Sequence, residues 1–379
     1  MIPFNKPYLT GKETHYIQDA VASGKISGNG IYTQKCQDFF EKKYGFKKAL
    51  LTTSCTDALE MAAILADLKQ GDEVIVPSFT FVSTAIAFIR QGAKIVFADS
   101  YADNPNIDAD TIESLITSRT KAIVPVHYAG VACDMDKIME LAARYNLIVI
   151  EDAAQAIDSF YTSKDGSVKA LGSIGHLAAF SFHETKNIIS GEGGMLAIND
   201  ERFIHRAEII WEKGTNRAEF FRGEINKYGW VDIGSSFLPS EVISAFLWAQ
   251  IENLDDIQKK RIALWNAYHT GLSAAQLSNI ELPKIPEFAT NNGHMFYISL
   301  KNIEERERLI SKLKLNGYHA VFHYISLHSS DYYTDKHDGR ALENADSFTN
   351  RLLRLPMFYE LKTEDINTIV QLIQQFHDE

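Results

Sequence analysis

Short apolar runs alternate with helix-like segments between residues 48 and 150, and this rhythm most limits how the chain can fold. The predicted strands are Ala49–Leu51, Val74–Val76, Ile95–Ala98, Ala122–Val126 and Ile148–Ile150. The segments between them carry apolar side chains at the spacing of a helix. Strands that are apolar throughout and separated by helices are typical of a mostly parallel sheet with helices on both faces. The sequence therefore predicts an α/β fold.

The rhythm stops near residue 240, where long helical patterns begin and continue to about residue 274. A strand near 295–300 and helices near 304–316 and 363–377 follow. We therefore expect a large domain over residues 1–250 and a smaller C-terminal α/β domain over residues 251–379. The large domain would begin with an arm over residues 1–45 that holds two helices.

A lysine stands in a polar turn after another predicted strand, Ala178–Phe182. Gly191, Gly193 and Gly194 follow Lys186 and allow the backbone to reverse before the next apolar run. A lysine at such a strand end can be held against a cofactor with its charge suppressed. The alternative is a solvated surface charge, as most lysines are.

Small hydroxyl residues follow the first strand in Thr52–Ala58, at the start of a predicted helix. They either cap the helix or form a seat for phosphate together with the free N–H groups of its first turn. No GxxxxGK[ST] motif is present, and no GxGxxG follows the first strand, so the sequence lacks a P-loop and a dinucleotide fingerprint. Phe81, after the second strand, belongs either to the core or to a surface that stacks on a planar ring.

Asp152 closes a fully apolar strand and Gln155 follows three residues later. A buried carboxylate needs a partner, so Asp152 either caps a helix or holds a proton on a ring nitrogen. Gln155 could meet a ring hydroxyl from the same helix face. An anion seat, a stacking aromatic, a buried acid and a turn lysine, all at strand ends, are what a pyridoxal phosphate (PLP) enzyme requires.

The amino-acid composition limits which binding partners and which cellular compartment we expect for the protein. The 379 residues carry a net charge of −11 with no basic block, which argues against nucleic acid and anionic membranes as partners. The three scattered cysteines indicate a reducing compartment and no structural zinc. The start lacks a signal-peptide pattern, and no apolar run reaches about 18 residues. We expect a cytoplasmic protein without a metal site.

Several longer strings make the chain resemble the DegT/DnrJ/EryC1/StrS sugar-nucleotide aminotransferases over essentially its full length. They are Val126–Asp136, Phe182–Asn187, Glu212–Arg217, Asp232–Ser236 and Phe322–Ile325. The resemblance implies the PLP-dependent transferase fold of type I and a homodimer whose active sites lie at the subunit interface.

The resemblance also implies roles for individual residues. Lys186 would hold PLP as a Schiff base, and Asp152 would pair with the pyridine nitrogen. Gln155 would contact the ring hydroxyl and Phe81 would stack on the ring. Cys55, Thr56 and Ser181 would hold the phosphate, and Ser236 stands where relatives place an asparagine from the neighbouring subunit.

Within the family, the strings resemble the subgroup that makes dTDP-4-amino-4,6-dideoxygalactose for enterobacterial common antigen or O antigen. The implied reaction transfers the amino group of L-glutamate, through pyridoxamine phosphate (PMP), to dTDP-4-dehydro-6-deoxyglucose. A 3-aminotransferase on a 3-keto dTDP-sugar, another nucleotide, and a non-catalytic PLP-binding regulator remain as alternatives. The candidate residues for the sugar nucleotide are His183, Lys213, Asn216, Arg217, His323, Tyr324 and His328.

Overall fold

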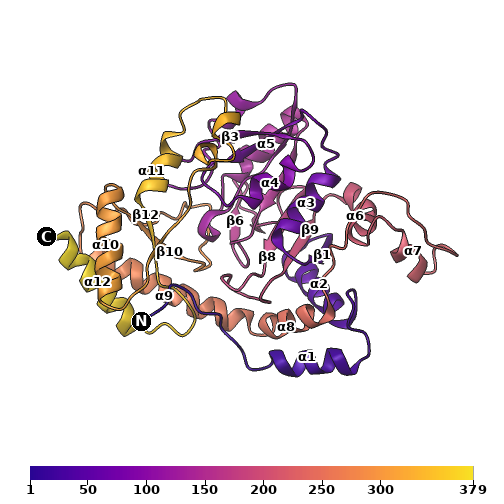
Figure 1. Cartoon of the computed structure of the whole chain (residues 1–379), viewed down its shortest axis with the longest axis horizontal. Coiled ribbons are helices and arrows are strands. Elements are labelled where there is room, and N and C mark those ends of the chain that lie inside the picture. The colour runs from indigo at the N-terminus through magenta and orange to yellow at the C-terminus, as the bar shows by residue number, and fades with distance from the viewer. Residues whose placement is uncertain (379) are drawn as a thin grey trace.

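The structure, a computed structural model that describes residues 1–378, is centred on a seven-stranded sheet of order β1-β9-β8-β5-β4-β2-β3 (Figure 1). Its strands are β1 (Lys48–Thr52), β2 (Glu73–Pro77), β3 (Lys94–Ala98), β4 (Thr120–Ile123), β5 (Ile148–Asp152), β8 (Leu177–Ser181) and β9 (Gly194–Ile198). Neighbouring strands from β8 to β3 are parallel, whereas β9 is antiparallel to both of its neighbours. The predicted mostly parallel sheet is confirmed.

The direction of β9 determines which strand ends meet. The chain reverses between β8 and β9, and Ser181 pairs with Gly194 at the end of the turn. Because β9 runs against both β8 and β1, these two strands run the same way as β5. The carboxyl ends of β1, β5 and β8 therefore share one edge of the sheet.

Strand β4 ends three residues earlier than the predicted strand. Pro125 has no amide hydrogen to donate to the ladder. Its carbonyl still accepts a bond from Asp152 N (2.8 Å), and Val126 forms an isolated bridge with Asp152. The chain thus stays beside β5 up to the start of the polar segment that follows.

Helices cover both faces of the main sheet, as predicted, and each face has its own buried apolar cluster. One cluster involves α3 (Cys55–Leu65), α4 (Ser83–Ile89) and α6 (Ile204–Trp211). The opposite cluster involves α2 (Ile31–Tyr44), α5 (Met135–Tyr145) and the neighbouring ends of α8 (Glu241–Ile251) and α9 (Leu254–Ala274). Helix α1 (Glu13–Ala22) packs along α8 (Figure 1).

A second sheet of three antiparallel strands lies beyond α9 in the order β10-β12-β11 (Figure 1). Its strands are β10 (Phe296–Ser299), β11 (Val321–Phe322) and β12 (Leu352–Leu355). Its apolar cluster includes residues of α9, α10 (Ile303–Leu315) and α12 (Thr363–His377). A domain boundary near residue 250 stays a prediction.

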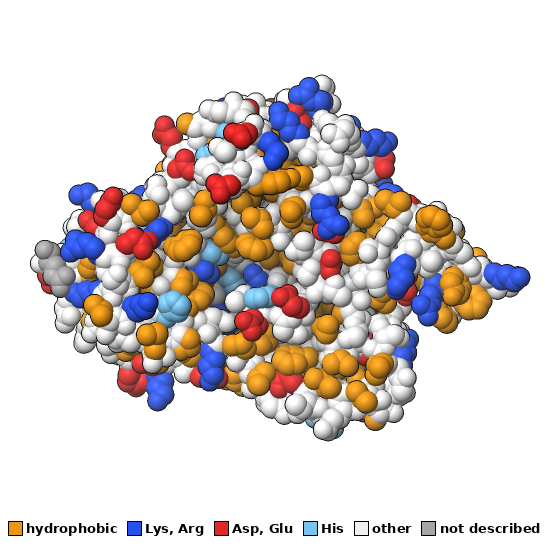
Figure 2. All heavy atoms as spheres, viewed as in Figure 1, with side chains coloured by type: hydrophobic (Ala, Val, Ile, Leu, Met, Phe, Trp, Pro, Cys, Tyr) orange, Lys and Arg blue, Asp and Glu red, His pale blue; other side chains and the backbone are white. Residues whose placement is uncertain are grey.

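The segment that includes α11 (Glu343–Arg351) returns to the main sheet. Leu327, Leu342, Ala345 and Phe348 belong to the same buried cluster as α3 and α4. This packing brings the second sheet against the carboxyl edge of the first. Figure 2 shows a hollow at the centre of this face in which histidine and cationic side chains gather.

Two smaller features complete the fold. The strands β6 (Phe160–Thr162) and β7 (Val168–Ala170) form a hairpin, and α7 (Arg217–Phe221) lies in a projection far from the second sheet (Figure 1). Within the described part of the chain, every helix is too short or too polar to cross a bilayer.

Candidate active site

A cavity of about 1180 Å³ lies where the second sheet meets the carboxyl edge of the first. Lys186, Asp152 and Ser181 line it from the ends of β8 and β5, and Cys55 and Thr56 line it from the start of α3. The opposite wall includes His323, Tyr324 and Arg354. Ligands of parallel α/β sheets bind at this edge, so the cavity is the candidate active site.

Lys186 is held in the turn between β8 and β9, where its N–H donates to the carbonyl of His183 (2.9 Å). Burial lowers the pKa of Lys186, the carboxyl of Asp152 partly offsets this effect, and the charge of Arg354 adds to it. A lowered pKa favours the neutral amine, which is the form that attacks a carbonyl or accepts a proton.

Asp152 ends β5 with its carboxyl group on the cavity side. Oδ2 accepts a hydrogen bond from the Thr84 hydroxyl (2.7 Å) and Oδ1 accepts one from Ala154 N (3.1 Å). Burial raises the pKa of Asp152, while these two bonds and the charge of Lys186 oppose the rise. A fixed carboxylate that lacks a full set of partners can take a further cationic or N–H partner in the cavity.

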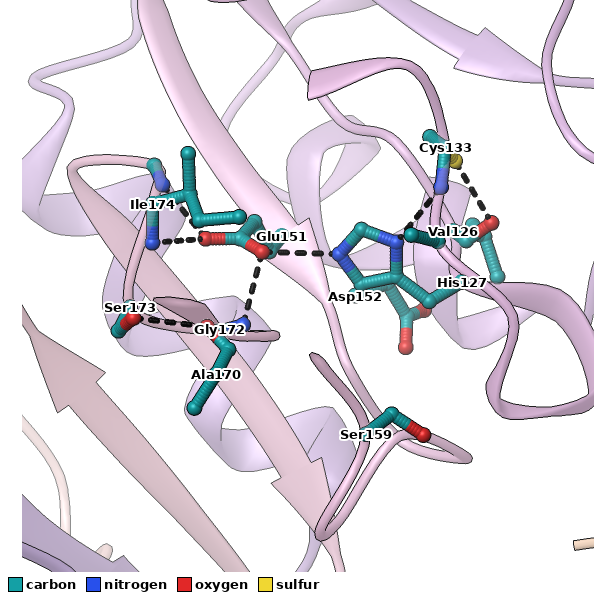
Figure 3. Close-up of polar contacts among 12 residues, drawn as sticks. Val126, His127, Cys133, Glu151, Asp152, Ser159, Ala170, Gly172, Ser173 and Ile174 are labelled. Carbon is teal, nitrogen blue, oxygen red and sulfur yellow. Dashed lines mark hydrogen bonds and ion pairs between the residues drawn. The ribbon is translucent and has the colours of Figure 1, made fainter. Parts of the chain in front are cut away.

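The neighbouring Glu151 points to the other face of the sheet and lies in a closed polar cluster (Figure 3). Its oxygens accept bonds from His127 Nε2, Gly172 N and Ile174 N, each 2.8 Å, and from Gly175 N (2.5 Å). Because Cys133 N donates to His127 Nδ1 (3.2 Å), the proton of this neutral imidazole is assigned to Nε2. The cluster fixes the segment after β4 beside β5.

The start of α3 has the features of an anion-binding site. Ser54 caps the helix through Asp57 N (3.0 Å), which leaves the N–H groups of Cys55 and Thr56 without acceptors among the described residues. The Thr56 hydroxyl meets Ser83 Oγ (2.8 Å). A side chain at Gly194 would overlap the backbone of Ser54 and Cys55, so this glycine allows the close approach of α3 to β9.

Aromatic and amide groups form the rest of the cavity wall. Phe81 is 55% exposed and its ring lies 6.2 Å from that of Tyr324. Gln155 accepts a bond from Ala129 N (2.6 Å) and donates to the Tyr324 hydroxyl (3.1 Å). His323 contacts the Tyr128 hydroxyl through Nδ1 (2.9 Å), and burial holds its pKa well below the usual value. The Phe81 face is free to meet a ring.

The residues present fit PLP. The amine of Lys186 and the carboxyl group of Asp152 line the same cavity as the anion seat of α3 and the open face of Phe81. PLP needs one group for its aldehyde carbon, one for its ring nitrogen and one for its phosphate. The donor set therefore matches the chemistry of the cofactor.

The structure brings most of the candidate residues to this cavity but not all. His183 lines it, and its Nδ1 contacts the Thr185 hydroxyl (2.9 Å). His328 lies behind the wall, where its Nδ1 contacts Ser78 Oγ (2.7 Å) and anchors the segment after β11 to the end of β2. The other candidates that do not line the cavity of their own chain lie on the projecting segment between α6 and α8: Lys213, Asn216, Arg217 and Ser236.

Several polar residues of the cavity were not among those predicted from the sequence, and three of them illustrate why. Thr84 orients Asp152, His294 lines the cavity with Nδ1 against Asn187 Oδ1 (2.9 Å), and Arg354 lines it from β12. Thr84 could have been found from its place at the start of α4, the helix that follows β2. His294 and Arg354 carry no local signal, because the packing of the second sheet brings them here.

Comparisons with known proteins agree with this geometry. A model of the DegT/DnrJ/EryC1/StrS aminotransferase family matches residues 7–374. The chain is 30% identical over 383 residues to the spore coat polysaccharide biosynthesis protein SpsC of Bacillus subtilis (strain 168), covering 98% of this chain and 96% of SpsC.

Solved structures share the whole fold. DesV of S. venezuelae superimposes with a TM-score of 0.90 at 28% identity, covering 100% of this chain and 99% of DesV. A putative sugar aminotransferase of Streptococcus pneumoniae, Spr1654, solved in its PMP form, gives a TM-score of 0.90 at 24% identity. Its alignment covers 100% of this chain and 99% of Spr1654, and its PLP form gives 0.89.

Proposed function

Because the chain belongs to the DegT/DnrJ/EryC1/StrS aminotransferase family, we propose that it aminates the C4 ketone of dTDP-4-dehydro-6-deoxy-D-glucose. L-Glutamate is the proposed donor, and the products are dTDP-4-amino-4,6-dideoxy-D-galactose and 2-oxoglutarate. The protein is a PLP-dependent sugar aminotransferase of fold type I. The predicted family, fold class and cofactor are confirmed.

The observation that carries the proposed reaction is the single cavity that both Lys186 and Asp152 line. The choice of dTDP and C4 rests on the resemblance of Phe182–Asn187 and the other strings to one subgroup. The relative SpsC is named for spore coat polysaccharide biosynthesis, which supports a role for this protein in cell-surface polysaccharide synthesis. We place the reaction in the cytoplasm.

When bound, PLP supplies an electron sink next to the carbon that loses or gains a proton. Asp152 would hold a proton on the ring nitrogen, and its bonds to Thr84 and Ala154 N would keep it in place. The start of α3 and Ser181 would hold the phosphate, Phe81 would cover the ring, and Gln155 would lie at the ring hydroxyl.

Lys186 would move the protons of both half-reactions. Its lowered pKa leaves a neutral amine able to accept the proton from Cα of the amino donor. In the second half-reaction it would return a proton to sugar C4. Delivery of this proton from one fixed face would set the configuration at C4, and the proposed product has the axial amino group of the galacto configuration.

We also propose a homodimer in which the projecting segment of one protomer reaches the cavity of its partner. Trp230 is 83% exposed and Phe221 is 68% exposed on this segment, and Ile233 is also exposed. Several large exposed apolar side chains on one segment are typical of an interaction surface. Ser236, Lys213, Asn216 and Arg217 on the same segment would then serve the neighbouring site. Sedimentation equilibrium should give twice the mass of the chain, and a monomer would reject this arrangement.

The test of the reaction follows the yellow absorbance of bound PLP. L-Glutamate should remove it, and dTDP-4-dehydro-6-deoxyglucose should restore it, with NMR of the product showing an axial amine at C4. Restoration only by a 3-keto dTDP-sugar would identify a 3-aminotransferase instead. Absorbance that L-glutamate leaves unchanged would reject catalysis with this donor and favour a PLP-binding regulator.

A further inference from the structure

Residues 326–345, which we call the clasp, run from β11 to the first turn of α11 and lie against the end of β2 and the outer edge of β3 (Figure 1). Leu327 N donates to the carbonyl of Ser78 (2.9 Å), and the Tyr333 hydroxyl contacts both N (2.9 Å) and O (3.0 Å) of Ile95. Leu327 also lines the cavity. The clasp therefore ties the cavity wall of the second sheet to the first sheet.

Two histidines of the clasp, His328 and His337, lie side by side with their ring centroids 5.1 Å apart. Only 10% of the His328 side chain and 8% of the His337 side chain are exposed. His328 Nδ1 contacts the hydroxyl of Ser78 (2.7 Å), and the His337 ring lies 6.1 Å from that of Phe97 on β3. Both imidazoles are thus enclosed between the clasp and the first sheet.

The hydrogen bonds of His328 require its neutral form. Its Nε2 faces the carboxylate of Asp346 (3.5 Å), so the proton of the neutral ring is assigned to Nε2 and the Ser78 hydroxyl donates to Nδ1. A second proton would occupy Nδ1 and leave the hydrogen of the fully buried Ser78 hydroxyl without this acceptor. If His337 gained a proton as well, two positive charges would repel each other across 5.1 Å in a largely buried place.

The carboxylates around His328 offset this cost only in part. Nearly half of the Asp346 side chain is exposed, so its attraction is weakened by water. Asp99, at the end of β3, already accepts two backbone N–H bonds from the first turn of α11 (2.8 and 3.1 Å). Burial lowers the pKa of His328, while Asp346 and Asp99 oppose this effect and His337 adds to it. The neutral form of His328 is therefore favoured in the closed clasp.

The charged groups around His337 form a pair of their own. Asp338 Oδ1 lies 3.5 Å from His337 Nε2, but its other oxygen is paired with Arg340 Nε (2.9 Å). His337 Nε2 donates to the carbonyl of Arg340 (2.8 Å), because a carbonyl can only accept. Arg340 Nη2 in turn donates to the carbonyl of Phe97 (2.9 Å), which places a further positive charge on the same edge of the sheet.

We propose that the clasp is a pH-sensitive latch, which holds the cavity wall against the first sheet while His328 and His337 are neutral and loosens when they gain protons. In an open clasp His328 would meet water and titrate near its ordinary value of about 6.5, so the open form binds more protons in acid. The closed form therefore has its full advantage above about pH 6.5 and loses it as the pH falls through the lowered pKa of His328. The latch does not depend on which sugar or amino donor the enzyme uses.

Hydrogen exchange of the PLP-loaded protein, followed by mass spectrometry, tests the latch. After correction for the intrinsic effect of pH, amides of the clasp should exchange about 3- to 10-fold faster at pH 5.5 than at pH 7.5. The reason is that each unit by which a pKa is lowered on closing can change the ratio of closed to open forms tenfold. Peptides of α9 should keep their protection, which separates local opening from global unfolding.

Three variants assign the effect to the two rings. In His328→Asn the amide oxygen can still accept from Ser78 but cannot be protonated near neutral pH, so exchange of the clasp should be equal at both pH values. His337→Gln removes the second charge without changing the contact with Ser78. It should reduce the pH effect, and it serves as the test if His328→Asn does not fold. His319→Gln, which replaces an exposed histidine outside the clasp, should behave as the wild type.

A release experiment links the latch to the cavity. Bound PMP should leave the wild type about 3- to 10-fold faster at pH 5.5 than at pH 7.5, as measured by its fluorescence, and the change should be absent in His328→Asn. Equal protection of the clasp at both pH values would overturn the proposal, as would a pH effect that survives in both His328→Asn and His337→Gln. Faster exchange in α9 as well as in the clasp would mean global unfolding and would also overturn it. Faster exchange of the clasp without faster PMP release would overturn its control of the cavity.

Discussion

The two carboxyl groups at the end of β5 are adjacent in sequence and opposite in surroundings. Glu151 is closed off behind the sheet by three backbone N–H groups and His127 (Figure 3). Asp152 faces the cavity, and among residues 1–378 its carboxyl group has only Thr84 and Ala154 N as hydrogen-bond partners. A carboxylate with every oxygen satisfied holds the fold together, whereas one with spare capacity beside a cavity is available to a ligand.

The same contrast separates the arginines Arg351 and Arg354. Arg351 is paired with Glu281 and the carbonyl of Leu300, and it supports the packing of α11 against the second sheet. Arg354 keeps a buried, unbonded Nε on the cavity wall. Unused hydrogen-bonding capacity therefore distinguishes the cavity-facing residue from its paired neighbour in both walls of the cavity.

The largest expected effect is on stability, from Glu151→Gln. The new amide group would place a donor against backbone N–H groups and remove the charge that His127 and these groups surround. We expect the free energy of unfolding to fall by about 3–5 kcal/mol, because two of the four donors would lose their acceptor at about 1–3 kcal/mol each. Urea denaturation measures this change. A variant as stable as the wild type would contradict the claim that Glu151, unlike Asp152, stabilises the fold.

Replacing the next carboxylate by an amide, in Asp152→Asn, should lower catalytic activity rather than stability. The amide has no charge with which to favour the protonated ring nitrogen of bound PLP, so kcat/KM should fall about 10²–10³-fold. Because burial raises the pKa of Asp152, loss of its charge should leave the stability of the apoprotein unchanged or higher. Near-normal kinetics in this variant would mean that Asp152 only caps the segment after β5.

The sequence predicted that Lys186, Asp152, Cys55 and Thr56 lie together, because they stand at strand ends of one sheet, and in the structure they line one cavity. Asp152 ends a strand of the main sheet, and Lys186, Cys55 and Thr56 follow two others. Strands that run the same way end at the same edge. The sequence did not predict that Glu151 joins His127, since the two lie 24 residues apart on neighbouring segments.

The residues that the second sheet contributes to the cavity could not be predicted from the sequence. Arg354 stands in Leu352–Leu355, an ordinary apolar strand by pattern, and only the packing of α11 on the first sheet brings it to the cavity. For the same reason, local sequence did not indicate that His328 anchors the end of β2. Lys213 and its neighbours stay candidate substrate residues because their segment projects away from the cavity of its own chain.

A smaller effect is expected from Gly194→Ala, which tests the proposed phosphate-binding site at the start of α3. The added methyl group would meet the backbone of Ser54 and Cys55 and push the helix start away from β9. We expect a loss of about 1–3 kcal/mol in unfolding free energy. The Kd for PLP should rise as well, since the N–H groups of Cys55 and Thr56 shift. Fluorescence titration of the apoprotein with PLP measures this. An unchanged Kd would place the phosphate elsewhere.

The smallest expected effect is a pH dependence due to Lys186. Its pKa is lowered in the folded protein, so the unfolded chain binds more protons between that lowered pKa and the ordinary value of 10.5. The apoprotein should therefore gain stability as pH rises through this range, by about 1.4 kcal/mol per unit of lowering. The difference between wild-type and Lys186→Met unfolding free energies across pH isolates this contribution. A difference that does not change with pH would show that Lys186 is solvated.

The most direct test of the account is to locate the bound cofactor. Borohydride reduction of the PLP-loaded protein fixes the cofactor to whichever lysine holds it, and peptide mass spectrometry identifies that residue. We expect the label on Lys186 and no label in Lys186→Ala, with that variant still folded. A label on Lys213 or another lysine, or PLP released unmodified from the wild type, would contradict the assignment of this cavity as the active site.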